Sequence, residues 1–194
     1  KAAGVETVGD IWFVGTVGEE GMGDLRGVRA LFEAHADAID GFISIDGALP
    51  ARIAFVAVGS HRYRVTFTGP GGHSFSDFGR PSAIHALGRA IAGIAELRTP
   101  QTPQTTFTVG IVAGGTSINT IAAEASFDLD LRSTDMGALR ELEAQALVAI
   151  DAALEAENAR WGFARPLEVR KELIGARPGG AQTVDAPIIQ AAAL

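Results

Sequence analysis

The sequence predicts an α/β domain that is interrupted by a ferredoxin-like α+β module. Residues 11–17 and 41–47 are short apolar runs that end near glycine and acid residues, which is typical of buried strands in an α/β sheet. From residue 58 onward the strand patterns alternate between apolar and polar residues, which indicates antiparallel strands with one wet face. We therefore expect residues 1–57 and 175–194 to belong to the α/β domain and residues 58–174 to form the insertion.

The first part of the chain brings acidic residues to strand ends. The run IWFVGTV is followed by Glu19 and Glu20, and the run GFISIDG reaches Asp46 after a helix pattern around Val28. In open α/β sheets, ligands bind in the crevice outside the carboxyl ends of the strands. Two predicted strands therefore deliver carboxylates to one edge.

The inserted module is predicted from its alternating strands and its two amphipathic helices. The expected elements are a strand at 61–69, a helix at 81–97, strands at 105–112 and 125–133, a helix at 135–154 and a strand at 166–173. Pro81 suits the first turn of the first helix, and Ser133 or Thr134 suits the cap of the second. The order β-α-β-β-α-β is that of ferredoxin-like domains. After the module, residues 185–194 begin a further helix.

Composition excludes several classes of partner. Sixteen Lys plus Arg against 23 Asp plus Glu give a net charge of -7, so we expect no nucleic acid partner. The chain has no cysteine, which is compatible with the cytoplasm and leaves His and carboxylates as the ligands for a transition metal. No apolar run approaches the roughly 20 residues of a membrane span, so we expect no membrane partner.

Because the sequence starts without Met and inside an apparent domain, we expect a fragment or a processed chain.

The adjacent acids Glu19 and Glu20 can divide the work of metal-assisted hydrolysis. One carboxylate can bind a metal ion while the other takes the proton of the attacking water. Such a pair alone is more often a solvated loop. The strand before it, the flanking Gly18 and Gly21, and the arrival of Asp46 at the same edge favour the functional interpretation.

Three further residues have both a structural and a functional interpretation. His73, in GPGGHS, is either an exposed loop histidine or a donor to a developing oxyanion. Asn119 is by default a turn residue, and Arg132 is by default an ion-paired surface group. A guanidinium can instead clamp a carboxylate. The other histidines lack a His or Glu partner at the spacing of a zinc helix, so we expect surface or packing roles for them.

Five segments in this order, TVGEEG, SIDG, TFTGPGGHS, GGTSINTIA and LDLRS, resemble the family of two-zinc exopeptidases and amidohydrolases. That family includes tripeptide aminopeptidase, carboxypeptidase G, aminoacylase and succinyl-diaminopimelate desuccinylase. The resemblance covers nearly the whole chain. It implies an α/β catalytic domain with a ferredoxin-like lid that mediates homodimerisation. It also implies a zinc-dependent metallopeptidase or amidohydrolase acting on a small peptide or an N-acyl amino acid, with cobalt or manganese as alternative metals.

The resemblance also assigns roles to the acids. Glu19 corresponds to the general base, Glu20 to a zinc ligand and Asp46 to a ligand of the other zinc. The family's His-x-Asp motif, its bridging Asp and its later ligand His have no counterpart in this sequence. We therefore expect the intact enzyme to hydrolyse amides and this chain alone to be inactive. Asp at position 46, where many relatives have Glu, favours an aminopeptidase-like substrate.

In the lid, the resemblance implies that His73 reaches the partner subunit's active site and stabilises the tetrahedral oxyanion. Asn119 and Arg132 match positions that hold the substrate's carboxylate or backbone. An alternative of another class is a non-catalytic dimerisation or peptide-binding module, because edge strands pair readily across a two-fold axis. A nucleotide-binding role for GPGGHS ranks below both, since no Lys follows the glycines.

Overall fold

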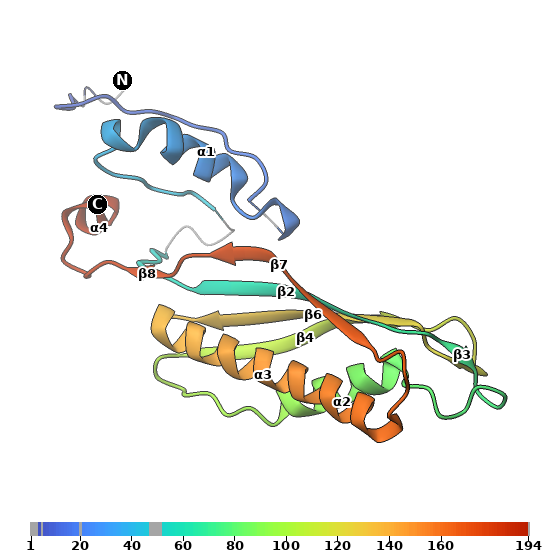
Figure 1. Cartoon of the computed structure of the whole chain (residues 1–194). Helices are drawn as coiled ribbons and strands as arrows, with labels where there is room; N and C mark the ends of the chain where they lie inside the picture. The colour runs from blue at the N-terminus through green and yellow to red at the C-terminus, as the bar shows by residue number, and fades with distance from the viewer. Residues whose placement is uncertain (1–3, 5, 20, 47–51, 194) are drawn as a thin grey trace. The chain divides into compact units, whose positions relative to one another are not determined.

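The structure is a computed structural model of the 194-residue chain (Figure 1). It describes residues 4, 6–19, 21–46 and 52–193. The chain divides into two compact units, Lys1–Phe42 and Ile43–Leu194, and each is described on its own.

The first unit is built around helix α1 (Arg26–His35), between two short 3-10 turns, η1 (Gly21–Gly23) and η2 (Ala36–Ala38). The helix lies against the segment that precedes it, where the Gly27 N–H donates to the Val17 carbonyl at 3.0 Å. A Cβ at Gly27 would lie 2.6 Å from that oxygen, so the close approach requires glycine here. The helix expected around Val28 is confirmed.

The prediction of strands at 11–17 and 41–47 is wrong for the residues that the structure describes. The described residues of both segments are irregular, and no strand is assigned to them. A β-strand exists through hydrogen bonds to a neighbouring strand, and apolar composition alone does not supply that neighbour. In the described part of the chain neither segment has one. Phe13 and Ile45 are accordingly almost fully exposed.

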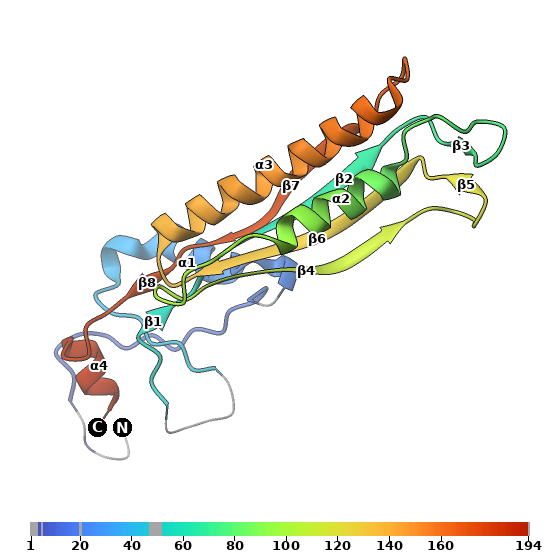
Figure 2. The same ribbon diagram turned by 90° about the horizontal axis from the view of Figure 1, so that it is seen from below.

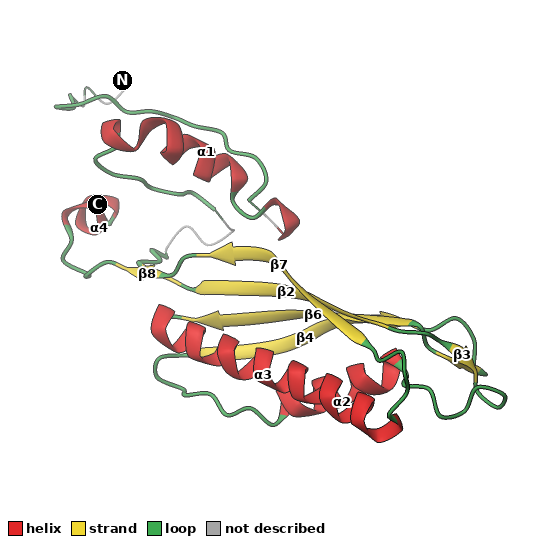
Figure 3. Cartoon of the chain, viewed as in Figure 1, coloured by secondary structure: helices red, strands yellow, loops and turns green. Residues whose placement is uncertain are grey.

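The second unit contains a four-stranded antiparallel sheet (Figure 3). Its strands are β2 (Gly59–Thr68), β4 (Thr105–Gly114), β6 (Glu124–Ser133) and β7 (Glu168–Arg177). They lie in the order β4-β6-β2-β7, and every neighbouring pair is antiparallel. With one helix after the first strand and another after the third, this is the predicted ferredoxin-like arrangement. The expected mixed fold is confirmed.

Helices α2 (Ala83–Ala95) and α3 (Met136–Trp161) cover one face of this sheet (Figure 2). The apolar core between helices and sheet includes Val65 and Phe67 from β2, Phe127, Leu129 and Leu131 from β6, Leu87 and Ile94 from α2, and Leu139, Leu142 and Ile150 from α3. The cap of α3 is Asp135, whose carboxylate accepts the Ala138 N–H at 2.8 Å, and neither Ser133 nor Thr134. The helix continues seven residues beyond the predicted end and stops where Gly162 adopts a left-handed conformation.

A buried acid ties the two helices together. The side chain of Glu157, on α3, is 0% exposed and accepts the Ser82 N–H at the start of α2, at 3.2 Å. It also accepts from Arg89 at 3.1 Å and from Trp161 at 3.0 Å. Burial opposes ionisation, but these hydrogen bonds and nearby His85 outweigh it and lower the pKa of Glu157. A charged group is therefore tolerated in the core because it caps a helix and binds a cation.

The opposite face of the sheet is polar, as the alternation predicts. Arg62 of β2 pairs with Asp130 of β6 at 2.9 Å, and Arg64 pairs with Asp128 at 2.7 Å. Each partner lies directly across the strand pair in the observed register. These cross-strand ion pairs lie on the face of the sheet that the helices do not cover.

In its described residues, the second unit also contains four short strands and one short helix. Strand β1 (Val56–Ala57) pairs with β8 (Gly180–Ala181), and α4 (Pro187–Ala192) follows. Strand β3 (Gly72–His73) pairs with β5 (Thr120–Ile121) at one end of the main sheet (Figures 1 and 2). The β3–β5 pair places two of the predicted site residues next to each other.

Candidate functional site

The β3–β5 pair brings His73 and Asn119 together. His73 lies opposite Thr120 in the register, and the Ser74 N–H donates to the Asn119 carbonyl at 2.9 Å. The Asn119 Nδ2 atom lies 3.4 Å from His73 Nε2. Ser117 Oγ donates to Asn119 Oδ1 at 2.8 Å and orients the amide. Two exposed polar side chains from distant parts of the sequence thus place their nitrogen atoms next to each other beside this strand pair.

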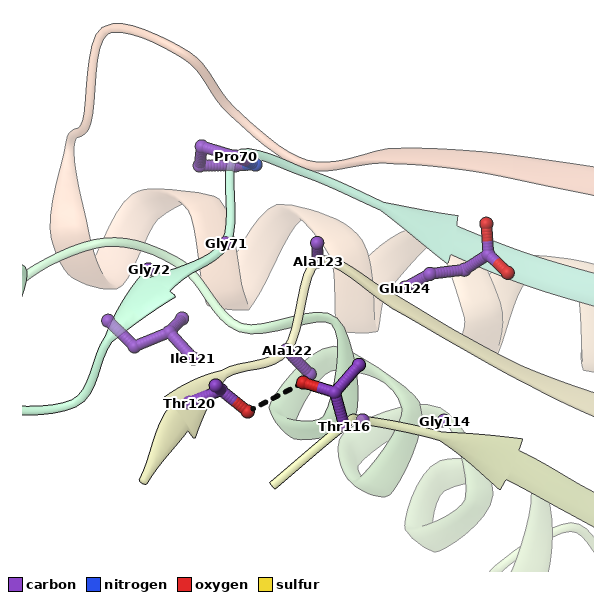
Figure 4. A pocket seen from close by; sticks show the side chains of 11 residues that line it. Pro70, Gly71, Gly72, Gly114, Thr116, Thr120, Ile121, Ala122, Ala123 and Glu124 are labelled. Carbon is purple, nitrogen blue, oxygen red and sulfur yellow. Dashed lines mark hydrogen bonds between the residues drawn. The ribbon is translucent and has the colours of Figure 1, made fainter. Parts of the chain in front are cut away.

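A cavity of about 400 Å³ lies beside this pair (Figure 4). It is lined by Pro70, Gly71, Gly72, Gly114, Gly115, Thr116, Thr120, Ile121, Ala122, Ala123 and Glu124. Most of these residues are small, so much of the lining is backbone. The hydroxyls of Thr116 and Thr120 lie 3.3 Å apart at its edge. An extended substrate can approach such a surface closely and exchange hydrogen bonds with the main chain.

One position in the cavity lining, residue 114, requires glycine because of its backbone conformation and its close neighbour. Gly114 has a φ of 151°, and a Cβ there would lie 2.7 Å from the Ala125 side chain on the neighbouring strand. No real Cβ makes so short a contact without a shift of the neighbour. The glycine at position 114 therefore lets two chain segments come close beside the cavity.

The loop after His73 contains two residues that sequence analysis missed. Asp77 Oδ2 accepts the His73 N–H at 2.8 Å, and its Oδ1 pairs with Arg80 at 2.7 Å. Arg80 in turn donates to the Gly71 carbonyl at 3.0 Å. The signal that could have found them is an acid four residues after the histidine in a glycine-bounded turn, which is a pattern for side-chain to backbone bonding.

Arg132 lies elsewhere on the sheet. Asn119 precedes the first residue of β6, Glu124, whereas Arg132 is near its last. At a rise of about 3.3 Å per residue, Arg132 is roughly 26 Å along the strand from Glu124. Arg132 pairs with Asp130 and is 47% exposed. The structure therefore does not bring Arg132 together with His73 and Asn119 in one copy of the chain.

Of the three acidic candidates, Glu19 and Asp46 are among the residues that the structure describes. Glu19 is half-buried in the first unit, and Asp46 is exposed in the second. Glu20 lies outside the described residues. Among the residues that the structure describes, no group of three His, Cys, Asp or Glu side chains could hold a metal ion. The described donor set therefore does not fit a two-zinc centre by itself.

The remaining histidines make packing and ion-pair contacts. His35 packs edge to face on Trp12, with ring centroids 5.4 Å apart. His61 lies 3.0 Å from Glu143, and His85 lies 3.6 Å from Glu157.

In the described ranges, none of the helices has both the length and the apolar character that crossing a bilayer requires.

Comparison with known families matches about half of the chain. Residues 57–159 match the family described as the peptidase dimerisation domain. This segment contains β2, α2, β4, β6 and most of α3, together with His73, Asn119 and Arg132. A search of curated proteins finds no match.

Solved structures with the same fold include an aminopeptidase and an amidase. Aminopeptidase PepT from Bacillus cereus is similar with a TM-score of 0.58 at 17% identity, over 76% of this chain and 37% of that protein. An aminobenzoyl-glutamate utilization protein from Klebsiella pneumoniae gives 0.55 at 19%, and a hydantoinase/carbamoylase family amidase from Burkholderia vietnamiensis gives 0.52 at 22%. Each of these two covers 66% of this chain and 30% of the relative. The chain thus spans about a third of the length of these proteins.

Proposed function

The chain belongs to the peptidase dimerisation domain family, and from this premise we propose that it is the lid, with adjoining segments, of an enzyme that hydrolyses amide or peptide bonds. The fold shared with an aminopeptidase and an amidase supports the proposal. In this proposal residues 58–174 are the lid, and residues 1–57 and 175–194 belong to a catalytic α/β domain. The substrate class is a small peptide or an N-acyl amino acid.

The observation that carries the proposal is the pairing of His73 with Asn119 next to the glycine-lined cavity, whose lining includes their chain neighbours Gly72 and Thr120. Their facing nitrogen atoms are 3.4 Å apart, close enough for one acceptor oxygen to contact both. When a nucleophile adds to an amide carbonyl, negative charge develops on the carbonyl oxygen, and prepositioned N–H donors stabilise that charge. His73 is the proposed oxyanion donor, and Asn119 holds the substrate beside it.

We propose that His73 and Asn119 act on the active site of a second copy. Arg132 lies roughly 26 Å along β6 from the end near Asn119, given the usual rise per residue, so one small substrate cannot contact both ends. Arg132 then clamps a carboxylate at the site of its own copy. A site that needs both groups is complete only in a dimer.

The exposed edges of the sheet indicate how a dimer would form. Strands β4 and β7 are the two edges. Strand β4 has no charged residue and exposes Ile111 and Val112, whereas β7 carries Glu168, Arg170, Lys171, Glu172 and Arg177. Charges on an edge strand discourage pairing with another chain. We therefore assign the homodimer contact to β4.

The catalytic acids complete the proposal. Glu19 is the proposed general base, and Glu20 and Asp46 are proposed ligands of two zinc ions. Zinc would polarise the substrate carbonyl and activate a water molecule. The described residues do not complete its donor set. This chain by itself is therefore expected to lack hydrolytic activity.

The proposal is tested by activity measurements on two polypeptides. With added zinc, the 194-residue chain should not cleave di- or tripeptides. In an enzyme that contains this chain and the remaining ligands, His73→Ala should lower kcat by about 100-fold or more, as removal of an oxyanion donor does, with zinc content unchanged. His85→Ala, another exposed histidine, is the matched control and should keep normal turnover.

Two results would contradict it. Loss of zinc in His73→Ala would mean that this residue is a ligand and not an oxyanion donor. Zinc-dependent cleavage by the 194-residue chain that disappears in Glu19→Gln would show that its metal site is complete.

A second candidate is a non-catalytic dimerisation module, which is supported because the family match covers only residues 57–159. An intact protein that contains the chain and does not hydrolyse amides would favour that candidate.

A further inference from the structure

The loop that carries His73 is closed by its own side chains. Asp77 makes two contacts with the His73 backbone: its Oδ2 accepts the N–H at 2.8 Å, and its own N–H donates to the carbonyl at 3.0 Å. Arg80 binds Asp77 at 2.7 Å and the Gly71 carbonyl at 3.0 Å. The Arg80 guanidinium also lies 5.5 Å from the ring centre of Phe163, beyond α3. Arg80 thus links the two ends of the loop to each other and contacts Phe163 outside it.

This closure puts main-chain donors against the imidazole. The N–H groups of Phe75 and Ser76 donate to His73 Nδ1 at 3.2 and 3.4 Å. A main-chain amide nitrogen can only donate, so Nδ1 must be the unprotonated nitrogen of the neutral ring. The proton is then on Nε2, the atom that faces Asn119. The Asn119 amide nitrogen can only donate as well, so with the proton on Nε2 the 3.4 Å contact between these two atoms is not a hydrogen bond. In this form both nitrogen atoms are donors, and an acceptor oxygen placed between them would accept from both.

Gly72 gives independent support for a built arrangement. Its φ is 156°, and a Cβ at this position would lie 2.8 Å from Asp77 Cβ and 2.9 Å from Asp77 Oδ2. Any side chain at residue 72 would push Asp77 away from His73. The glycine before the histidine is thus required for the contact between Asp77 and the His73 backbone.

We propose that Asp77 and Arg80 are positioning residues that hold His73 in the Nε2–H form. They fix the turn so that the amides of residues 75 and 76 occupy Nδ1 and a neutral N–H donor is presented beside Asn119. This inference rests on the proposed function for the role of His73 in catalysis. The tautomer itself can be measured on the 194-residue chain without any substrate.

The test is nuclear magnetic resonance of the imidazole nitrogens at alkaline pH, where free imidazole is neutral. The chain has four histidines, and His73→Ala identifies the resonance of interest. In the native chain the Nδ1–H population of His73 should be smaller than in the same chain unfolded by denaturant. Asp77→Ala should return it to the unfolded value. It should also make the His73 amide exchange roughly tenfold faster or more, because a hydrogen bond to a charged acceptor is lost.

Two controls isolate the effect. Asp77→Asn keeps an acceptor for the His73 N–H and loses the ion pair, so it should give an intermediate Nδ1–H population. Glu96→Ala removes an 82% exposed acid elsewhere and should leave the His73 ring unchanged. The inference is overturned if the native ring has the unfolded tautomer mixture, or if Asp77→Ala leaves the ring as it is. A normal kcat in His73→Ala would instead overturn the proposed function and leave this result standing.

Discussion

Tyr63 shows how a single residue on the helix side of the sheet depends on its neighbours. Its hydroxyl donates to Glu143 of α3, and His61 lies 3.0 Å from the same carboxylate. Burial, this hydrogen bond and the negative charge of Glu143 together raise the pKa of Tyr63 to about 12. The alternation of apolar and polar residues in 61–69 puts Tyr63 on the same face as Val65 and Phe67, but it carries no information about an acid 80 residues away in sequence.

The phenol of Tyr63 should titrate near pH 12 in the folded chain and near 10 after unfolding. Because the folded pKa is raised, the stability that this group contributes is complete below pH 10 and is lost as the pH rises toward 12. Tyr63 is the chain's only tyrosine, so tyrosinate absorbance reports it directly. Glu143→Gln should lower the measured pKa, and Glu155→Gln, on the exposed face of α3, should not. An unshifted titration in the native chain would contradict the contact.

At the scale of elements, alternation predicted the long strands and missed the short ones. Strand β6 was expected at 125–133 and runs Glu124–Ser133, because one face is buried throughout and the period is clear. The two-residue pair of β3 and β5 is too short to show any period. The predicted strands at 11–17 and 41–47 failed for the opposite reason, since their apolar runs are clear but no described segment pairs with them.

The charge difference between the two edge strands leads to a prediction about association. Ile111→Lys on β4 should weaken self-association by roughly 30-fold or more, since a buried interface residue that costs about 2 kcal/mol has that effect. Val148→Lys on α3 is the matched control, because Val148 is 67% exposed against 61% for Ile111. Sedimentation at micromolar concentration measures both variants. A wild-type chain that sediments as a monomer would contradict the assignment to β4.

The candidate site could be predicted in part. His73 was singled out because it lies in a small-residue segment, Asn119 was singled out through the family resemblance, and the structure brings them together. Their positioning residues, Asp77 and Arg80, were missed because their contacts are with the main chain, and sequence spacing does not reveal main-chain geometry. The separation of Arg132 from the other two became visible only once Arg132 was placed near the far end of β6.

At the scale of the whole molecule, burial is concentrated in one region. Every residue that is buried in the described part of the chain lies between Gly59 and Gly175. Among the residues of 6–19, 21 and 23–46, whose burial the structure describes, none is buried, and several large apolar side chains are exposed. Since apolar burial is the main favourable term in folding, nearly all of it comes from the four-stranded sheet and its two helices.

A chain cut to residues 56–182 should therefore keep the stability of the full chain. These bounds keep the pairing of β1 with β8 and the whole of β7. We expect one cooperative transition in urea and a free energy of unfolding within about 1 kcal/mol of the full chain, because few buried contacts are removed. Limited proteolysis of the full chain should remove residues before 56 first. A shorter chain, 56–163, loses the edge strand that pairs along β2 and should fail to fold. A broad transition in 56–182 would show that the ferredoxin-like module depends on the flanking segments, and that the boundaries at 58 and 174 do not mark an independent lid.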